Sequence, residues 1–168
     1  MDFDQAFEIL IDPAHEGGYV DNPADPGGAT RYGVTERLAR AYGYQGDMRV
    51  YPLAEAKRVA KAQFWDAEHC DELPSAVRYD VFDFAYNAGD VRGVHLIQRA
   101  AGVADDGIFG DQTRRAIAGM NPLELKILFN AERLSYYASL DIFADFGRGW
   151  TRRVATNMRM VDPGAVKN

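Results

Sequence analysis

The sequence contains one cysteine, Cys70, among 168 residues. A single cysteine cannot close an internal disulfide, so the fold must rest on its packed core. Cys70 stands beside His69, but two residues that are adjacent in sequence do not for that reason form a nucleophile and its base in space. We therefore expect Cys70 to be a small buried or half-buried side chain near a helix end.

Long apolar runs are also absent. No stretch approaches the roughly 18 consecutive apolar residues of a membrane-spanning helix. The first residues, MDFD, contain no basic segment followed by an apolar run, which a secretory signal peptide of the usual kind requires. We therefore expect a soluble chain that is made in the cytoplasm, without stable membrane insertion. If its substrate lies beyond the membrane, another factor must let it through.

An excess of positive charge is missing as well. The chain has 25 acidic and 19 basic side chains, which give a formal net charge of −6. Binding of nucleic acid needs clustered lysine and arginine, so we expect no nucleic-acid partner. With 47% hydrophobic residues the chain is globular, and its length suits one compact domain or one domain with a small second lobe.

The sequence does contain a series of amphipathic segments. Apolar residues recur at spacings of three and four, which is the period of a helix with one buried face. This period predicts helices over residues 2–15, 35–42, 53–69, 74–88, 91–101, 111–118, 123–138 and 147–158. Pro13 predicts a break or kink near Asp12, because a proline inside a helix loses one backbone hydrogen bond. The expected fold class is mainly α.

Local signals mark several helix ends. Asp2 or Asp4 is suited to cap the first helix, and Thr35 is suited to cap the second. Pro74 fits the first turn of a later helix, which Gly89 is expected to end.

Residues 17–34 differ from the rest, because they are dense in glycine, proline, aspartate and asparagine. Such density marks turns. Within the segment, residues 19–20 and 30–32 are suited to pair as a small hairpin. We therefore expect a helical fold with a small β-hairpin and loop region near residues 17–34.

Glu16 directly precedes this segment and follows a hydrophobic helix. Cleavage of a glycosidic bond needs a protonated carboxyl group in a partly apolar setting, and usually a second carboxylate. A hairpin of this length can bring Asp25 and Thr30 back towards Glu16, where a threonine hydroxyl would orient water. The residues alone leave two interpretations open, namely this catalytic one and a surface glutamate at a helix end followed by a simple turn.

Saccharide binding uses aromatic rings together with amide or hydroxyl groups. The candidate contacts are Tyr19, Asn22, Tyr32, Trp65, Tyr86 and Asn87. A groove position and a core position suit Trp65 equally, whereas Asn87 near the end of an apolar helix needs a polar partner and suits a groove. The acidic residues of the loop lack the ligand pattern of a calcium loop, and the three histidines have no ligand spacing, so we expect no metal and no cofactor.

Several motifs together resemble glycoside hydrolase family 108, which comprises bacteriophage endolysins and related bacterial muramidases. They are EGGY at residues 16–19, DPGGAT at 25–30, YGVT at 32–35, FW at 64–65, CDELP at 70–74 and DFAYNAG at 83–89. The stretch LIQRA at residues 96–100, followed by DGIFG at 106–110, looks like the peptidoglycan-binding module that usually follows in this family. The resemblance implies a lysozyme-like catalytic lobe over residues 1–90 and a helical peptidoglycan-binding-like lobe over residues 91–168, packed as one compact unit.

The resemblance also implies an activity, which is hydrolysis of the β-1,4 bond between N-acetylmuramic acid and N-acetylglucosamine in bacterial peptidoglycan. The family's catalytic glutamate precedes Gly-Gly-Tyr and falls on Glu16. Asp25 and Thr30 follow at a spacing similar to that of phage-type lysozymes, one residue shorter before the threonine, and are expected to act as second carboxylate and water-binding hydroxyl. Two alternatives stay open. One is a lytic transglycosylase, for which Asp25 is dispensable, and the other is a non-catalytic cell-wall-binding module that docks glycan around Asp106 and Gly107.

The expected partner is the glycan strand of peptidoglycan, bound by a monomer that a holin or a secretion system releases to the wall. The acidic net charge leaves the approach to an anionic wall to a local basic patch. On the last predicted helix such a patch consists of Arg148, Arg152, Arg153 and Arg159.

Overall fold

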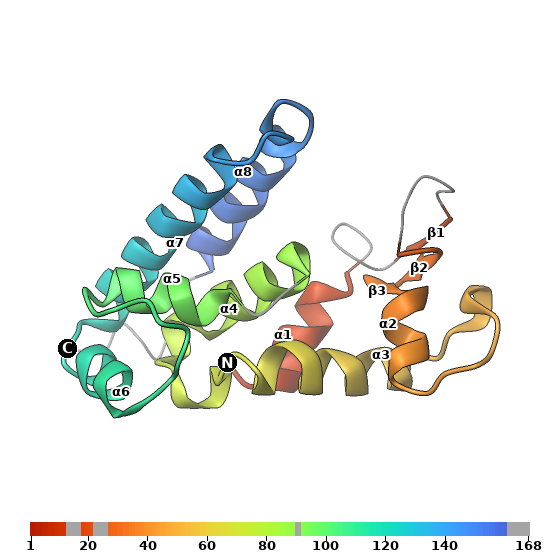
Figure 1. Ribbon diagram of the computed structural model, residues 1–168, viewed down its shortest axis with the longest axis horizontal. Coiled ribbons are helices and arrows are strands. Elements are labelled where there is room, and N and C mark those ends of the chain that lie inside the picture. The colour runs from red at the N-terminus through yellow and green to blue at the C-terminus, as the bar shows by residue number, and fades with distance from the viewer. Residues whose placement is uncertain (13–17, 22–26, 90–91, 161–168) are drawn as a thin grey trace. The chain divides into compact units, whose positions relative to one another are not determined.

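The computed structural model describes residues 1–12, 18–21, 27–89 and 92–160 (Figure 1). The chain divides into two compact units, one of residues 2–67 and one formed by Met1 and the residues from Glu68 onward. Helices predominate among the described residues, and the strands there form one small sheet. The prediction of a mainly α, lysozyme-like fold with a small β-hairpin region is confirmed.

The unit of residues 2–67 contains short helices and the sheet. Its elements are α1 (Phe3–Leu10), β1 (Tyr19–Val20), β2 (Thr30–Arg31), β3 (Val34–Thr35), α2 (Glu36–Ala41), a 3-10 turn (Met48–Val50), α3 (Leu53–Ala60) and a π-helical segment (Lys61–Asp66).

Helix α1 begins at the predicted cap. The Asp2 carboxylate accepts a hydrogen bond from the backbone N–H of Gln5 at 2.9 Å, and the Gln5 side chain accepts one from the backbone N–H of Asp2 at 3.1 Å. These two bonds form a capping box. The helix ends at Leu10, before the predicted residue 15, in a tighter turn where the N–H of Asp12 donates to the carbonyl of Ile9 at 3.3 Å. The break predicted at Pro13 lies outside the described residues.

The three strands form an antiparallel sheet in the order β1-β2-β3. The pairing of β1 with β2 confirms the predicted hairpin, whereas β3 was not predicted. Tyr32 and Gly33 connect β2 to β3, and both have a positive φ, 54° and 77°, as a type I′ turn requires. Asparagine or glycine is usual at the first of these positions, so a tyrosine there gave no hairpin signal.

Helix α2 starts from the end of this sheet. The Thr35 hydroxyl accepts a hydrogen bond from the backbone N–H of Leu38 at 3.3 Å, which confirms the predicted cap. The first two amides of α2 donate to the carbonyls of Ala29 at 2.7 Å and Gly27 at 3.1 Å. These bonds satisfy helix-end donors and fix the segment that leads into β2 against the start of α2.

Helix α3 passes directly into the π-helical segment, where the sequence predicted one α-helix over residues 53–69. A π turn holds one more residue than an α turn. Along this segment two successive residues, Phe64 and Trp65, are both buried. The Trp65 ring meets the Phe3 ring edge-on, with 5.5 Å between ring centroids.

The second unit is helical throughout its described part. Its elements are a 3-10 turn (Cys70–Glu72), α4 (Ser75–Ala88), α5 (Gly93–Ala100), α6 (Asp111–Ala118), α7 (Pro122–Ala138) and α8 (Phe143–Arg159). Cys70 is buried, as predicted. Helix α8 begins before the predicted Gly147, because the Phe143 ring packs over that glycine, where an added Cβ would lie only 2.7 Å from ring atoms.

Helix α4 is buried along most of its length, and α7 packs against α4, α5 and α8 (Figure 1). Gly89 ends α4 as predicted, because its φ of 75° is a left-handed conformation and its N–H donates to the carbonyl of Ala85 at 2.9 Å.

A buried carboxylate caps helix α5 from a distant part of the chain. Glu68 accepts hydrogen bonds from the backbone N–H groups of Gly93 at 2.8 Å and Val94 at 2.7 Å. A negative charge is favourable at a helix N-terminus, where N–H groups lack intrahelical partners. Gly93 permits this approach, because an added Cβ would lie 2.7 Å from a Glu68 carboxylate oxygen.

Candidate functional site

The predicted catalytic carboxyl groups, Glu16 and Asp25, lie outside the described residues, and so does Asn22. The described residues around them show how the loop is held on its C-terminal side. Gly28 has a φ of 76° and passes close to the Glu36 side chain, where an added Cβ would lie 3.2 Å from a carboxylate oxygen. The second glycine of DPGG, Gly28, is therefore required by its backbone conformation and by its close approach to α2.

The small sheet separates two of the predicted site residues. Tyr19 pairs with Arg31, whereas Thr30 pairs with Val20 on one side and Thr35 on the other. Successive residues of a strand point to opposite faces, so the side chains of Tyr19 and Thr30 lie on opposite faces of the sheet. The sheet therefore does not bring these two predicted contacts together.

Tyr19 and Tyr32 remain accessible to a ligand. Tyr19 is exposed and donates a weak hydrogen bond to the Asp21 carboxylate at 3.3 Å, and desolvation together with that carboxylate raises the pKa of the phenol. Tyr32 is half-buried at the I′ turn, and the Arg31 guanidinium lies 5.1 Å from its ring centroid. A tyrosine at positive φ is uncommon and costs backbone energy, and such positions concentrate at functional sites.

The sequence left Trp65 either in a groove or in the core, and the structure places it in the core. It is fully buried and packs on Phe3. Tyr86 is also buried, and its ring meets Phe82 edge-on with 5.9 Å between centroids. Asn87, one helical position further along, is half-buried, and its Oδ1 accepts a hydrogen bond from the Tyr137 hydroxyl at 2.8 Å.

Sequence reasoning missed a buried polar cluster beneath Asn87. The Asp83 carboxylate is fully buried, and it pairs with Arg133 at 2.7 Å and with Arg153 at 2.7 Å. Asn157 donates a further hydrogen bond to it at 2.7 Å. Burial alone would raise the pKa of Asp83, but the two guanidinium groups outweigh it and hold that pKa below its usual value.

The motif DGIFG has a structural role in the described residues. Buried Gln98 donates from Nε2 to the Asp106 carboxylate at 2.7 Å and to the carbonyl of Ile108 at 3.1 Å, and its Oε1 accepts the N–H of Gly107 at 2.9 Å. Gly107 has a φ of 74°, and an added Cβ would lie 2.6 Å from the His95 ring. The polar groups of this motif thus join α5 to the loop before α6.

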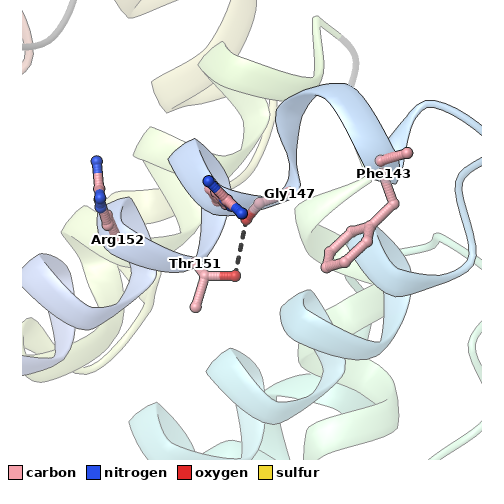
Figure 2. Close-up of a pocket in the computed structure, with 6 residues that line it drawn as sticks. Phe143, Gly147, Thr151 and Arg152 are labelled. Atoms are coloured by element: carbon pink, nitrogen blue, oxygen red, sulfur yellow. Dashed lines mark hydrogen bonds between the residues drawn. The ribbon is translucent and has the colours of Figure 1, made fainter.

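An open pocket of about 420 Å³ lies along one face of α8, and Figure 2 shows the residues that line it. Among the described residues its lining consists of Phe143, Ala144, Gly147, Arg148, Thr151 and Arg152, all on that helix. Arg148, Arg152 and Arg159 are exposed, and none has an ion-pair partner within the described part of the chain. Arg153 instead turns inward to Asp83, so the predicted basic patch contains three arginines rather than four.

Among residues 1–12, 18–21, 27–89 and 92–160, no group of three histidine, cysteine, aspartate or glutamate side chains is placed to hold a metal ion. No helix in the same residues is long and apolar enough to cross a membrane.

Comparison with known proteins gives the chain its family. Residues 12–89 match the family model of glycosyl hydrolase 108. The structure is similar to that of SagA from Brucella abortus, with 32% sequence identity and a TM-score of 0.84 over 94% of this chain and 91% of that chain. Curated protein sequences yield no match. The chain therefore belongs to glycosyl hydrolase family 108 and is a glycoside hydrolase with a lysozyme-like fold.

Proposed function

We propose that the chain is an N-acetylmuramidase, which hydrolyses the β-1,4 bond between N-acetylmuramic acid and N-acetylglucosamine in peptidoglycan. The observation that carries this proposal is the family match over residues 12–89, which contains the EGGY block with Glu16 and the DPGGAT block with Asp25 and Thr30. A glycosidase of this kind needs an acid that protonates the leaving oxygen and a second group that serves the attacking water.

Each residue has a separate role in the proposed reaction. Glu16 protonates the glycosidic oxygen, which makes the departing sugar a neutral leaving group. Asp25 stabilises the oxocarbenium-like centre or positions the water that attacks it, and the Thr30 hydroxyl binds that water. No metal or cofactor takes part in these steps.

The same proposal assigns the glycan contacts. Tyr19 and Tyr32 are accessible rings on which sugar faces can pack, and Asn22 and Asn87 supply amide groups. Trp65 and Tyr86 are buried, so the proposal gives them no direct contact with a sugar. Residues 91–168 contribute wall binding as a peptidoglycan-binding-like lobe, and the protein acts as a monomer after a holin or a secretion system releases it.

Product analysis tests the proposal. Purified peptidoglycan is digested with the wild-type chain and with Asp25→Asn, and the soluble fragments are reduced with borohydride and identified by mass spectrometry. We expect reduced N-acetylmuramic acid ends from the wild type and a much smaller yield from Asp25→Asn. Anhydro-muramic ends at an undiminished yield from Asp25→Asn would instead identify a lytic transglycosylase, and binding without new ends would identify a wall-binding module.

Wall binding is expected to depend on the exposed arginines of α8. Arg152→Gln should weaken binding of the chain to purified anionic wall at low salt by a factor of roughly two to five, because an exposed charge contributes up to about 1 kcal/mol there. The difference should vanish near 0.5 M salt, where screening is nearly complete. Co-sedimentation across a salt series measures both effects.

Arg115→Gln is the matched control for this variant. Arg115 is also exposed, and it lies on α6 rather than on the α8 face. Equal weakening by the two variants would mean that net charge, and not the α8 face, governs wall binding.

A further inference from the structure

Three polar pairs join α4 to α7 in a regular ladder. Their members are Asp80 with Asn130, Asp83 with Arg133, and Asn87 with Tyr137, at 2.8, 2.7 and 2.8 Å. On each helix the partners fall at positions i, i+3 and i+7, which lie on one helical face. Each pair is separated by 50 residues in the chain, so the two helices run in the same direction. The last rung, Asn87 with Tyr137, is the rung whose asparagine is half-buried rather than fully buried.

The hydrogen-bond direction at this last rung is determined by its neighbours. Arg133 has only donors, so its Nε–H donates to the Tyr137 oxygen, at 3.1 Å. The single hydroxyl hydrogen of Tyr137 is then directed to Asn87, at 2.8 Å. An amide offers its oxygen to such a donor, so Oδ1 of Asn87 is the atom that faces Tyr137.

Tyr137 is rigid enough to maintain this arrangement. Its side chain is only 2% exposed, and its ring stacks on Trp150 with 4.7 Å between centroids and meets Phe84 edge-on at 5.9 Å. Burial raises the pKa of the phenol by more than the Arg133 guanidinium lowers it, so the hydroxyl stays protonated and remains a donor. Arg133 is in turn held by Asp83.

The consequence concerns the other half of the Asn87 amide. With Oδ1 engaged, the Nδ2 amino group is the part of the side chain left for a ligand. Its two hydrogens have no hydrogen-bond partner within the described residues. The Tyr137 bond therefore fixes which end of the Asn87 amide faces away from it, namely the amino group, whereas a freely rotating asparagine could turn either end to a ligand.

We propose that Tyr137 is a positioning residue, which orients Asn87 so that its amino group donates to the acetamide carbonyl of an N-acetylated sugar in the glycan. This inference rests on the proposed function, because that function places Asn87 against the substrate. A carbonyl oxygen accepts and never donates, so it matches the Nδ2 amino group that this orientation presents. Sugar hydroxyls both donate and accept and would not need a fixed amide orientation.

Substrates with and without the acetyl group test the inference. The substrates are soluble glycan fragments, either fully N-acetylated or chemically de-N-acetylated, and initial rates give KM and kcat. Asn87→Asp keeps an acceptor for Tyr137 but has no donor for the carbonyl. We expect its KM for the acetylated fragments to rise roughly tenfold with kcat little changed. The reason is that the variant loses about one hydrogen bond, which the wild type makes equally in the ground state and the transition state. On de-N-acetylated fragments, which lack the carbonyl, the variant should show no such rise in KM.

Tyr137→Phe tests the positioning step. This variant frees the Asn87 amide to rotate and should raise KM for acetylated fragments by a factor of roughly three to ten. The control, Tyr136→Phe, makes the same change on the adjacent ring, whose contacts include the Phe84 ring, the Tyr137 ring and the Arg92 guanidinium. Because the control keeps the ring and loses only a hydroxyl that, among the described residues, does not bond to Asn87, it should leave KM unchanged. If Tyr137→Phe fails to fold, Asn87→Asp and Asn87→Ala carry the test by themselves.

The possible failures are distinct. If Asn87→Asp cleaves acetylated fragments with the wild-type KM, or loses the same factor on both substrates, Asn87 does not recognise the acetamide and the inference is wrong. If the wild-type chain releases no muramic ends from either substrate, it is the proposed function that fails.

Discussion

Replacing Glu16 with glutamine should abolish lysis of peptidoglycan, with a fall in rate of roughly 10²–10⁴-fold, which is the usual contribution of a general acid. Glutamine has nearly the size and shape of glutamate, but its amide cannot protonate the departing sugar oxygen. The rate should stay low at every pH, because no titration restores a proton donor at this position. Turbidity of a purified wall suspension and release of muramic ends measure the loss.

Glu8→Gln is the control for this experiment. Glu8 is exposed on α1 and lies eight positions before Glu16, and the same change there should leave the rate within about twofold of the wild type. Both variants should unfold at the wild-type temperature. Wild-type clearance by Glu16→Gln would contradict the assignment of the acid, whereas loss of clearance in both variants would point to damage of the fold.

Helix ends were predictable from the sequence because their causes are local. Asp2 and Thr35 each cap a helix from within four residues, and Gly89 ends α4 because it takes up a positive φ. Such signals need only the adjacent backbone, so they can be read from a short window of sequence. The apolar period likewise placed the helices that follow Pro74.

The elements that differ from the sequence prediction do so because of tertiary packing or an unusual local conformation. Strand β3 follows a turn in which Tyr32 has a positive φ, a conformation that few tyrosines adopt. The π-helical segment retains the apolar pattern of an α-helix, so periodicity did not reveal it. Phe143 extends α8 upstream by packing over Gly147, although glycine lowers helix propensity.

For the candidate site, too, the local features could be predicted from the sequence and the long-range contacts could not. The candidate catalytic residues around Glu16 could be predicted from their motif, because the motif is contiguous. The polar ladder between α4 and α7, which includes Asn87, was not predicted, because it joins residues 50 positions apart. One signal for it was present in the sequence, namely the polar residues Asp80, Asp83 and Asn87 at positions i, i+3 and i+7 of an otherwise apolar segment.

Asp83→Asn should destabilise the protein by about 3–5 kcal/mol, the usual cost of removing one partner of a buried ion pair. The reason is that Arg133 is fully buried and would keep its charge without a counter-charge at 2.7 Å. Arg153 and Asn157 lose a charged acceptor at the same time. Urea denaturation followed by circular dichroism gives the free energy of unfolding. A loss below about 1 kcal/mol would show that the buried pair adds little to stability.

Asp80→Asn is the contrasting change on the same helix, and we expect it to cost no more than about 1–2 kcal/mol. Burial raises the pKa of Asp80, and the nearby Lys126 and Asn130 only partly offset that shift, so the charged form of Asp80 is itself unfavourable in the fold. Lys126 would still donate to the carbonyl of Met160 at 2.8 Å.

The two carboxyl groups should also differ in how they link stability to pH. The folded pKa of Asp83 is depressed, so its stabilisation is complete above the unfolded pKa of about 4 and is lost as the pH falls through the folded pKa. The folded pKa of Asp80 is raised, so the folded protein binds more protons at that site, and its contribution to stability increases as the pH falls through that pKa towards about 4. Asp83→Asn should therefore reduce the fall in the free energy of unfolding below about pH 4. Asp80→Asn should leave that fall unchanged and alter the pH dependence of stability only above about pH 4. Urea titrations between pH 3 and pH 7 separate the two, and identical pH profiles for both variants would show that the two sites do not titrate independently.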